Sequence, residues 1–522
     1  MFTTFNISMK KIIFYIVIII IVSSCNNNRS NSNHQNAKVI NNVKVGKFLI
    51  IGTTDDLRAF EYLNIINFSS ASLKLKNCIT DRKVIGDSIV MEIDSISEPQ
   101  LLSLTSWSKD FKYRAAFIAK PNDTIIFEIK NKRFIIIGEK ADEHNFYSSL
   151  EDSTPNYKNN PYKGNILEYK SKVDSIYRKK VDFFNKYVSR HNITSKLFID
   201  FVESDLKYSH IYELIIPRTK NTVDSVYLGG QDEFLTIIQK EYSSKEQLFN
   251  LKDYLGDIKI DDFKEESHLN RFSFKSALSA TIRYYFETSD YPSYSKEKFL
   301  AEKAVIEHNF DEKIKEYAIA SLITVYHGTG FGHSKKSVSF FKNEISEYGK
   351  LYPDSQYTKE MEDITEDLNS FELKLPESAL NTKLLSKHGD TLTLDEIFNR
   401  SNKRIRVIDF WASWCPPCIS EIQKAQNFRD KLSVENNVEW IYLSIDNDKD
   451  KWLKKSKELE SYLNVRNQYL VINGTNSPLG RHLNVSWIPR YIILNKQNEI
   501  VLNNSPHPSD SIVFKGIINS IE

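Results

Sequence analysis

Two cysteines three positions apart, Cys415 and Cys418, are the residues of this chain best suited to carry chemistry. A thiolate is the nucleophile of thiol–disulfide exchange, and a second thiol one helical turn away closes a disulfide with the first. The chain has 4 cysteines in all, and the other two, Cys25 and Cys78, stand alone. This distribution is not that of a fold held together by several disulfides.

A Cys-x-x-Cys pair also occurs in zinc sites and in structural disulfides. A zinc site needs further ligands, and the sequence offers no second Cys-x-x-Cys and no convincing His pair. A disulfide across three residues closes too small a loop to stabilise a fold much. The sequence therefore predicts a redox-active Cys415–Cys418 disulfide, with no dissociable cofactor and no metal ion.

The elements expected around the pair favour this chemistry. Residues 404–410 form an apolar run typical of a buried strand, and one helical face after Cys418 is apolar. Cys415 then lies at a helix N-terminus, where N–H groups and the helix dipole favour a thiolate. Asp409 inside the strand is costly to bury without a role, and burial raises the pKa of a carboxyl. We therefore expect Asp409 to exchange a proton with Cys418.

The segment Asp409–Cys418, DFWASWCPPC, resembles the active site of the thioredoxin superfamily. Its flanks are similar to the TlpA/ResA-like branch, which are membrane-tethered thiol–disulfide oxidoreductases facing the periplasm. The resemblance covers residues 375–522 and implies an α/β thioredoxin-like fold. It also implies disulfide-containing envelope proteins as substrates and an upstream thiol donor as a partner.

The resemblance assigns further positions around the pair. Pro489 matches the cis-proline that faces the disulfide, Asp409 matches the buried acid, and Glu421 matches a glutamate just after the cysteines. The catalytic residues are thus expected to be Cys415, Cys418, Glu421, Asp409 and Pro489. The substrate-binding residues are expected to be Trp414, Pro416, Pro417 and Ile488. The alternatives are a trans bond at a strand start for Pro489, a solvated strand end for Asp409 and a helix-dipole role for Glu421.

Two positions depart from the pattern of thioredoxins, which often carry a Lys near the buried acid and a Thr after the cis-proline. Tyr442 and Arg490 stand there instead. Pro416 and Pro417 also have no N–H to donate to a Cys415 thiolate. A mildly acidic Cys415 is expected to give a reductant with a potential of roughly −270 mV, rather than an oxidant near −120 mV.

The resemblance leaves rival functions open. One is a thiol oxidase or isomerase on the same scaffold. Another is a binding lipoprotein in which the redox region is an accessory. A peroxiredoxin-type peroxidase fits less well, because Pro417 before Cys418 does not match its pattern.

The N-terminus reads as a targeting signal. Lys10 and Lys11 precede a short apolar run, residues 12–22, and Ser23 and Ser24 lead into Cys25. This order is typical of a secretory signal, and it resembles the bacterial lipobox, in which the cysteine is lipidated. We expect a lipid anchor at Cys25 and a periplasm-facing location in the cell envelope. Residues 1–24 are then the signal peptide and residues 25–45 a flexible, Asn-rich tether.

The rest of the 522-residue chain is too long for one core. Residues 46–144 carry short strand-like runs separated by turn residues, which predicts a small antiparallel β domain. Residues 145–372 have helical periodicity and predict an all-α middle domain. Residues 373–522 alternate strands and helices, which completes a multidomain fold with a C-terminal α/β thioredoxin-like domain.

The charge balance and the remaining motifs argue against nucleic-acid, phosphate and metal binding. Lys and Arg number 70 against 68 Asp and Glu, so nothing favours nucleic-acid binding. The glycine-rich segment 327–336 fits neither phosphate-loop spacing, and we expect a mobile inter-helix loop. Its two histidines, His327 and His333, are not expected to bind metal. Cys78 is expected to be a buried, inert thiol.

Overall fold

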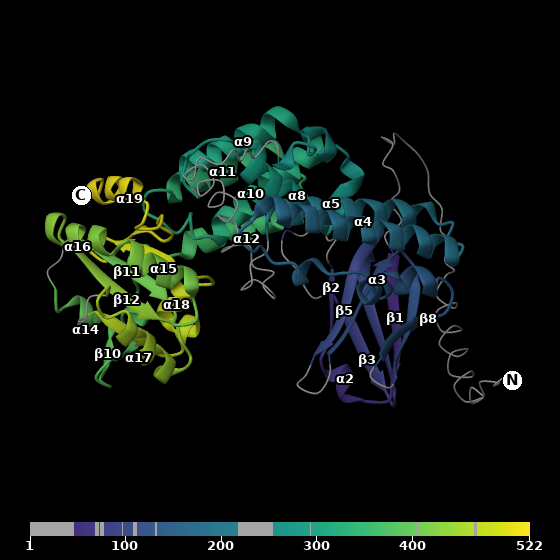
Figure 1. Ribbon diagram of the computed structural model, residues 1–522, viewed down its shortest axis with the longest axis horizontal. Coiled ribbons are helices and arrows are strands. Elements are labelled where there is room, and N and C mark those ends of the chain that lie inside the picture. The colour runs from purple at the N-terminus through teal and green to yellow at the C-terminus, as the bar shows by residue number, and fades with distance from the viewer. Residues whose placement is uncertain are drawn as a thin grey trace, which may run out of the picture. The chain divides into compact units, whose positions relative to one another are not determined.

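The computed structural model describes residues 46–67, 73, 78–96, 98–107, 112–130, 133–217, 254–292, 294–401, 405–463 and 467–521. The expected signal peptide and tether, with Cys25, lie outside the described residues. From Val45 onward the chain forms one compact unit. Along it a β-rich region, a helical region and an α/β region follow one another (Figure 1).

The β-rich region contains two sheets around one apolar core. The five-stranded sheet has the order β3-β4-β1-β7-β8, and the three-stranded sheet has the order β2-β5-β6. The strands are β1 (Gly46–Thr54), β2 (Leu63–Asn67), β3 (Asp81–Ile85), β4 (Ser88–Ile96), β5 (Gln100–Trp107), β6 (Lys112–Ala119), β7 (Thr124–Lys130) and β8 (Arg133–Ile137), with the short helix α2 (Arg58–Glu61).

The predicted antiparallel pattern is wrong at one pairing, because β1 and β7 are parallel. A turn at residues 121–123 joins β6 to β7, and Asn122 adopts a positive φ of 59° there. However, β6 and β7 belong to different sheets. The turn therefore delivers β7 to the free edge of β1 instead of closing a hairpin with β6.

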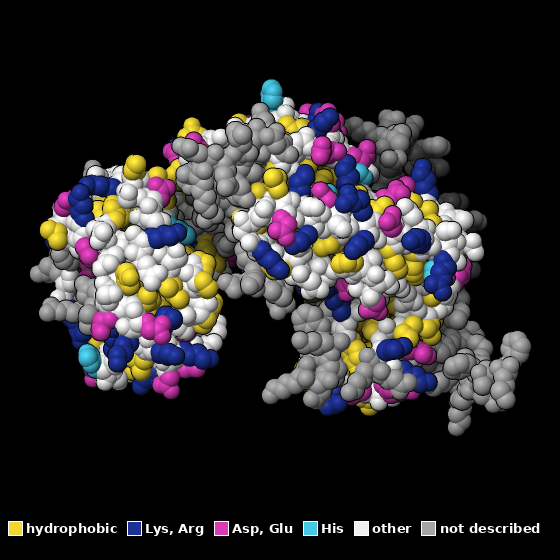
Figure 2. Space-filling view, in the orientation of Figure 1, with side chains coloured by type: hydrophobic (Ala, Val, Ile, Leu, Met, Phe, Trp, Pro, Cys, Tyr) yellow, Lys and Arg dark blue, Asp and Glu magenta, His cyan; other side chains and the backbone are white. Residues whose placement is uncertain are grey.

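The helical region confirms the predicted class. Its helices are α3 (Ala141–Ser153), α4 (Ile166–Arg190), α5 (Lys196–Ile215), α8 (Phe272–Thr281), α9 (Lys296–Asn309), α10 (Glu312–Gly328), α11 (Val338–Leu351) and α12 (Thr358–Ser370), with a π-helical turn at Ile282–Phe286. Local sequence sets several starts: the Asn165 and Ser195 side chains accept hydrogen bonds from N–H groups of the first turns of α4 and α5. On the face visible in Figure 2, Lys and Arg side chains are interspersed with Asp and Glu.

The C-terminal region is built on a seven-stranded sheet of order β10-β9-β13-β12-β11-β14-β15, with β11, β12 and β13 parallel. Its strands are β9 (Lys383–Ser386), β10 (Thr391–Thr393), β11 (Ile405–Trp411), β12 (Val438–Ser444), β13 (Gln468–Val471), β14 (Arg490–Leu494) and β15 (Ile500–Leu502). Its helices are α13 (Glu377–Leu380), α14 (Leu394–Phe398), α15 (Pro416–Lys424), α16 (Gln426–Glu435), α17 (Lys449–Glu458), α18 (Pro478–His482) and α19 (Ser511–Asn519).

The central strands are buried on both faces, as expected for a covered parallel sheet. One face of β11, with Val407 and Trp411, packs in a cluster with Cys418 of α15 and Phe514 of α19. The other face, with Ile408, packs against α13, α14 and α18. The buried strand predicted at residues 404–410 is confirmed as β11, and so is the predicted alternation of strands and helices in this region.

Candidate active site

The two cysteines of the motif form a disulfide, Cys415–Cys418, at the start of α15. Strand β11 ends at Trp411, and Cys415 is the N-cap residue of α15. A proline at the first helical position suits this start, because its missing N–H has no intrahelical partner to lose. Cys418 is fully buried and Cys415 is 4% exposed. The predicted strand–turn–helix arrangement is confirmed, and any partner reaches Cys415 first.

One backbone donor points at the Cys415 sulfur. The N–H of Cys418 donates to Cys415 Sγ at 3.2 Å. In a helix the N-cap side chain accepts from the second or third residue, and here the second is Pro417, which has no N–H. A Cys415 thiolate therefore receives a single N–H from the first turn of α15.

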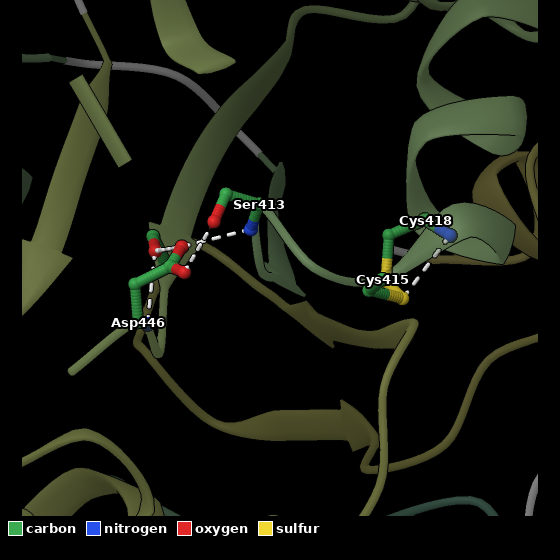
Figure 3. The surroundings of a disulfide bond; sticks show 5 residues. Ser413, Cys415, Cys418 and Asp446 are labelled. Carbon is green, nitrogen blue, oxygen red and sulfur yellow. Dashed lines mark hydrogen bonds between the residues drawn. A yellow bond between two sulfur atoms is a disulfide. The ribbon is translucent and has the colours of Figure 1, made fainter. Parts of the chain in front are cut away.

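A second strand end holds the loop that leads into the disulfide. Asp446, just after β12, accepts hydrogen bonds from Ser413 N at 2.8 Å and from Ser413 Oγ at 2.6 Å. Ser444 Oγ donates to Asp446 at 2.7 Å. Figure 3 shows Ser413 and Asp446 at one end of the loop and the two cysteines at the other. This contact between Ser413 and Asp446 positions the loop and was not predicted from the sequence.

Asp409 lies in the middle of β11 and is fully buried. Side chains alternate along a strand, so Asp409 faces the same side of the sheet as Val407 and Trp411, which is the side of Cys418. Neither carboxyl oxygen has a hydrogen-bond partner among the described residues. Desolvation raises the pKa of Asp409 to about 7, with the positive charge of Arg429 opposing the rise. The expected buried acid is present, poised to gain or lose a proton near neutral pH.

The cation near Asp409 comes from a helix. Tyr442, at the position where thioredoxins often have Lys, is directly opposite Asp409 in β12. Arg429 of α16 stacks over the Tyr442 ring at 5.6 Å, and its Nη2 donates to the carbonyls of Ile422 and Tyr462. Arg429 thus supplies the positive charge that a strand lysine brings in many thioredoxins, and no local pattern of residues predicted this role.

Glu421 is buried in α15 and accepts hydrogen bonds from Ser509, which lies just before α19. Ser509 Oγ donates to Glu421 Oε1 at 2.6 Å, and Ser509 N donates to Oε2 at 3.3 Å. Burial alone would raise the pKa of Glu421, but His507, whose Nδ1 lies 3.7 Å from Glu421 Oε1, and the hydrogen bonds from Ser509 hold the pKa below its ordinary value. Glu421 is therefore an anion whose charge helps to raise the pKa of Asp409. Neither Ser509 nor His507 was predicted as a partner of Glu421.

The Ile488–Pro489 bond is cis, as predicted. Ile488 is half-buried and packs against the cluster that contains both cysteines. Trp414 is 62% exposed, and Pro416 and Pro417 are exposed as well. Trp414, Pro416 and Pro417 therefore form an exposed rim beside the disulfide, and Ile488 lies half-buried next to it.

Arg490, which follows the cis-proline, is fully buried and faces away from Asp409. It pairs with Phe410 in the register of β11 and β14, and Phe410 belongs to the opposite face of the sheet. Its Nε donates to the Asn503 carbonyl at 2.7 Å, and its guanidinium stacks over Trp487 at 4.2 Å. Burial lowers the pKa of Arg490 to about 9. The arginine is thus a packing element on the far side of the sheet.

The remaining thiol, Cys78, is only half-buried, which corrects the expectation of a fully buried residue. Its Sγ donates to the Ile65 carbonyl at 3.4 Å. Desolvation raises the pKa of Cys78 to about 11, so the thiol stays protonated at neutral pH. A protonated thiol is a poor nucleophile, which leaves Cys415 and Cys418 as the redox pair.

Comparison with known proteins agrees with this geometry. Residues 402–500 match the family model described as thioredoxin-like. Residues 9–26, which include Cys25, match the model of a prokaryotic membrane lipoprotein lipid attachment site. The C-terminal region is therefore a thioredoxin-like domain, and the N-terminus carries a lipid attachment site. No curated protein matches the chain.

Solved structures similar to this chain include three from Bacteroides. A thiol-disulfide oxidoreductase from Bacteroides fragilis is 19% identical, with 27% of this chain and 99% of that chain covered and a TM-score of 0.23. The thioredoxin domain of a Bacteroides vulgatus thiol-disulfide oxidoreductase is 18% identical, covering 26% and 91%, with a TM-score of 0.22. A thiol:disulfide interchange protein from a Bacteroides species is 16% identical, covering 27% and 86%, with a TM-score of 0.23.

In the described part of the chain, none of the helices combines the length and the apolar character that crossing a bilayer requires.

Proposed function

We propose that this chain is a lipid-anchored thiol–disulfide oxidoreductase that reduces disulfides of envelope proteins on the periplasmic side. The observation that carries the proposal is the Cys415–Cys418 disulfide at the start of α15, with the buried, unpartnered Asp409 on the same side of the sheet. The thioredoxin-like domain and the lipid attachment site support the reaction class and the anchor.

The reaction follows from the burial of the two cysteines. The Cys415 thiolate attacks an accessible disulfide of the substrate, forms a mixed disulfide and releases one substrate thiolate. Cys418 passes its proton to Asp409, and the Cys418 thiolate then attacks Cys415 Sγ. This step releases the second substrate thiol and closes the Cys415–Cys418 disulfide. A dithiol donor of the envelope returns the two electrons that the substrate has received.

The surroundings of Cys415 favour the reductive direction. The thiolate accepts one N–H, that of Cys418, and the anion Glu421 places negative charge in the same helix. Arg490 lies on the opposite face and offers no compensating contact. A weakly stabilised thiolate makes the reduced form a good electron donor, whereas a strongly stabilised one makes an oxidant.

Insulin reduction by dithiothreitol tests the reaction. The wild-type chain is expected to accelerate it, and Cys415→Ser is expected to abolish the acceleration because the attacking thiolate is gone. Cys418→Ala is expected to accumulate mixed disulfides, which a non-reducing gel detects. Cys78→Ser serves as the matched control and is expected to retain full activity. Undiminished reduction by Cys415→Ser would refute the assignment.

Membrane fractionation tests the anchor separately. Cys25→Ala removes the acylated residue, so the protein is expected to leave the membrane fraction or to fail to mature. A Cys25→Ala protein that stays membrane-bound with unchanged mobility would contradict the lipid anchor while leaving the redox assignment intact.

A further inference from the structure

Two histidines and an aspartate meet at one end of the helical region. His327 lies in the last turn of α10, His333 in the turn between α10 and α11, and Asp367 in the last turn of α12. These three helices pack against one another (Figure 1). His327 Nε2 is 2.8 Å and His333 Nε2 is 2.6 Å from the same oxygen, Asp367 Oδ2.

The glycines of the segment 327–334 explain how the turn reaches this position. A β-carbon on Gly332 would lie 2.7 Å from both Leu368 and Phe341, so only glycine lets the turn lie this close to α11 and α12. Gly330 has a φ of +80°, which other residues rarely adopt. The turn is therefore an inter-helix connection, as predicted. Most of its side chains are buried, however, and its glycines serve close packing.

Packing against Phe371 fixes the orientation of the His333 imidazole. The His333 ring lies 4.2 Å from the ring of Phe371, and its side chain is 5% exposed. The Asp367 side chain is 48% exposed, so one side of the cluster is open to water. The three candidate ligand atoms lie within 4.8 Å of one another. Two imidazole nitrogens, a carboxylate oxygen and an open side are the donor set of a three-ligand transition-metal site with room for water.

We propose that His327, His333 and Asp367 bind one divalent transition-metal ion, with Zn²⁺ as the representative ion. The ion takes the place of the protons now shared between each Nε2 and the carboxylate oxygen. Two imidazole ligands favour zinc-like ions over Mg²⁺ and Ca²⁺, which prefer oxygen. The proposal reverses the expectation from the sequence, where Asp367 stands 34 residues after His333 and gives no ligand spacing.

The surroundings of His333 limit the affinity of the site for a metal ion. His333 Nδ1 is buried and has no hydrogen-bond partner in the described part of the chain. Metal-bound histidines normally donate this second nitrogen to an acceptor, and losing such a partner costs about 10–100-fold in affinity. A moderate affinity is therefore expected, below that of a site with a complete outer shell.

The turn also connects the cluster to strands of the thioredoxin-like domain. Asn503 N donates to Ser334 Oγ at 3.0 Å, and Lys335 N donates to the Ile500 carbonyl at 3.0 Å. An ion that holds α10, the turn and α12 together would brace these contacts. The stability of the folded chain is then expected to rise with free metal concentration.

Zinc titration of the full chain in detergent tests the proposal. The chain is stripped with a chelator, kept with Cys415–Cys418 oxidised, and carries Cys78→Ser, so that no thiolate competes for the ion. Calorimetry is expected to find one equivalent of Zn²⁺ bound at this cluster, and the Tm is expected to rise with Zn²⁺ concentration. Co²⁺ is expected to give visible absorption bands of a site with nitrogen and oxygen ligands.

Variants separate a metal site from a purely hydrogen-bonded cluster. Asp367→Asn keeps an acceptor oxygen and an exposed position, so the metal-free Tm should stay near that of the parent. Its Zn²⁺ affinity is expected to fall at least tenfold, as is that of His327→Gln. His308→Gln, on an exposed position of α9, is the matched control and is expected to bind Zn²⁺ normally. The proposal is overturned if the parent binds no Zn²⁺ with an unchanged Tm, or if Asp367→Asn binds as tightly as the parent.

Discussion

Asp409 in the thioredoxin-like domain and Asp367 in the helical region are carboxylates in opposite circumstances. Asp409 is fully buried, and no described residue donates a hydrogen bond to either of its oxygens. Asp367 is half exposed, and one of its oxygens lies within 2.8 Å of two imidazole nitrogens. A buried carboxyl without partners gains and loses a proton easily near neutral pH, whereas a carboxylate flanked by imidazoles suits a bound cation.

The surroundings of the two carboxyl groups thus decide what each of them can do. In β11, apolar neighbours and the anion Glu421 disfavour the charged form of Asp409, and Arg429 only partly compensates. At the end of α12, the groups around Asp367 come from the α10 end and the following turn. The surroundings of Asp409 favour proton transfer, and those of Asp367 favour binding of a cation.

Replacing Asp409 should have its strongest effect on catalysis. Asp409→Asn removes the proton acceptor of Cys418, and general-base catalysis is typically worth about 10²–10⁴-fold, so the release of reduced substrate should slow by roughly 100-fold. Stopped-flow measurement of mixed-disulfide decay gives this rate. Asp448→Asn is the control, because Asn also caps α17 well. Equal decay rates for Asp409→Asn and the wild type would mean that Asp409 is not the base.

The second prediction concerns stability. The folded pKa of Asp409, about 7, lies above its unfolded value of 3.8, so the folded state binds the proton more tightly. The contribution of Asp409 to stability is therefore complete below about pH 4 and is lost as the pH rises to about 7, by about 1.4 kcal/mol for each pKa unit.

Urea unfolding from pH 4 to pH 8 measures this loss. Asp409→Asn cannot ionise, so the free energy of unfolding of the variant should rise relative to the wild type as the pH increases through this window. A difference that stays constant across the window would show that the pKa of Asp409 is not raised.

The smallest expected effect is on the reduction potential. Pro417→Ala restores the N–H of the second helical residue, which points at the N-cap sulfur. One hydrogen bond to a charged acceptor is worth about 1.5–3 kcal/mol, which corresponds to about 30–60 mV toward the oxidising side. Pro416→Ala restores an N–H at the first helical position, which does not point there, and should change the potential less. Equilibration with glutathione, followed by Trp fluorescence, compares the two.

If both proline variants leave the potential unchanged, the missing N–H groups do not set the strength of this redox pair. A wild-type potential near −120 mV would lead to the same conclusion and would favour the oxidase alternative over the reductase.

The parts of the site that are contiguous along the chain could be predicted from residue types. The strand, turn and helix around Cys415 and Cys418 and the buried position of Asp409 follow from an apolar run and from helix-start chemistry. The cis bond before Pro489 was predicted from the resemblance to thioredoxins, because a proline at the start of a strand is commonly trans.

The distant residues that complete the two sites became evident only from the folded chain. Arg429 of α16 brings a positive charge near Asp409, where Tyr442 stands in place of the lysine common in thioredoxins. Ser509 reaches Glu421 across 88 residues of sequence. Asp367 joins His327 across 40 residues, because the end of α12 lies beside the end of α10. The parallel pairing of β1 with β7 escaped prediction for the same reason. Such contacts depend on how whole elements pack, and no local pattern of residue types records that packing.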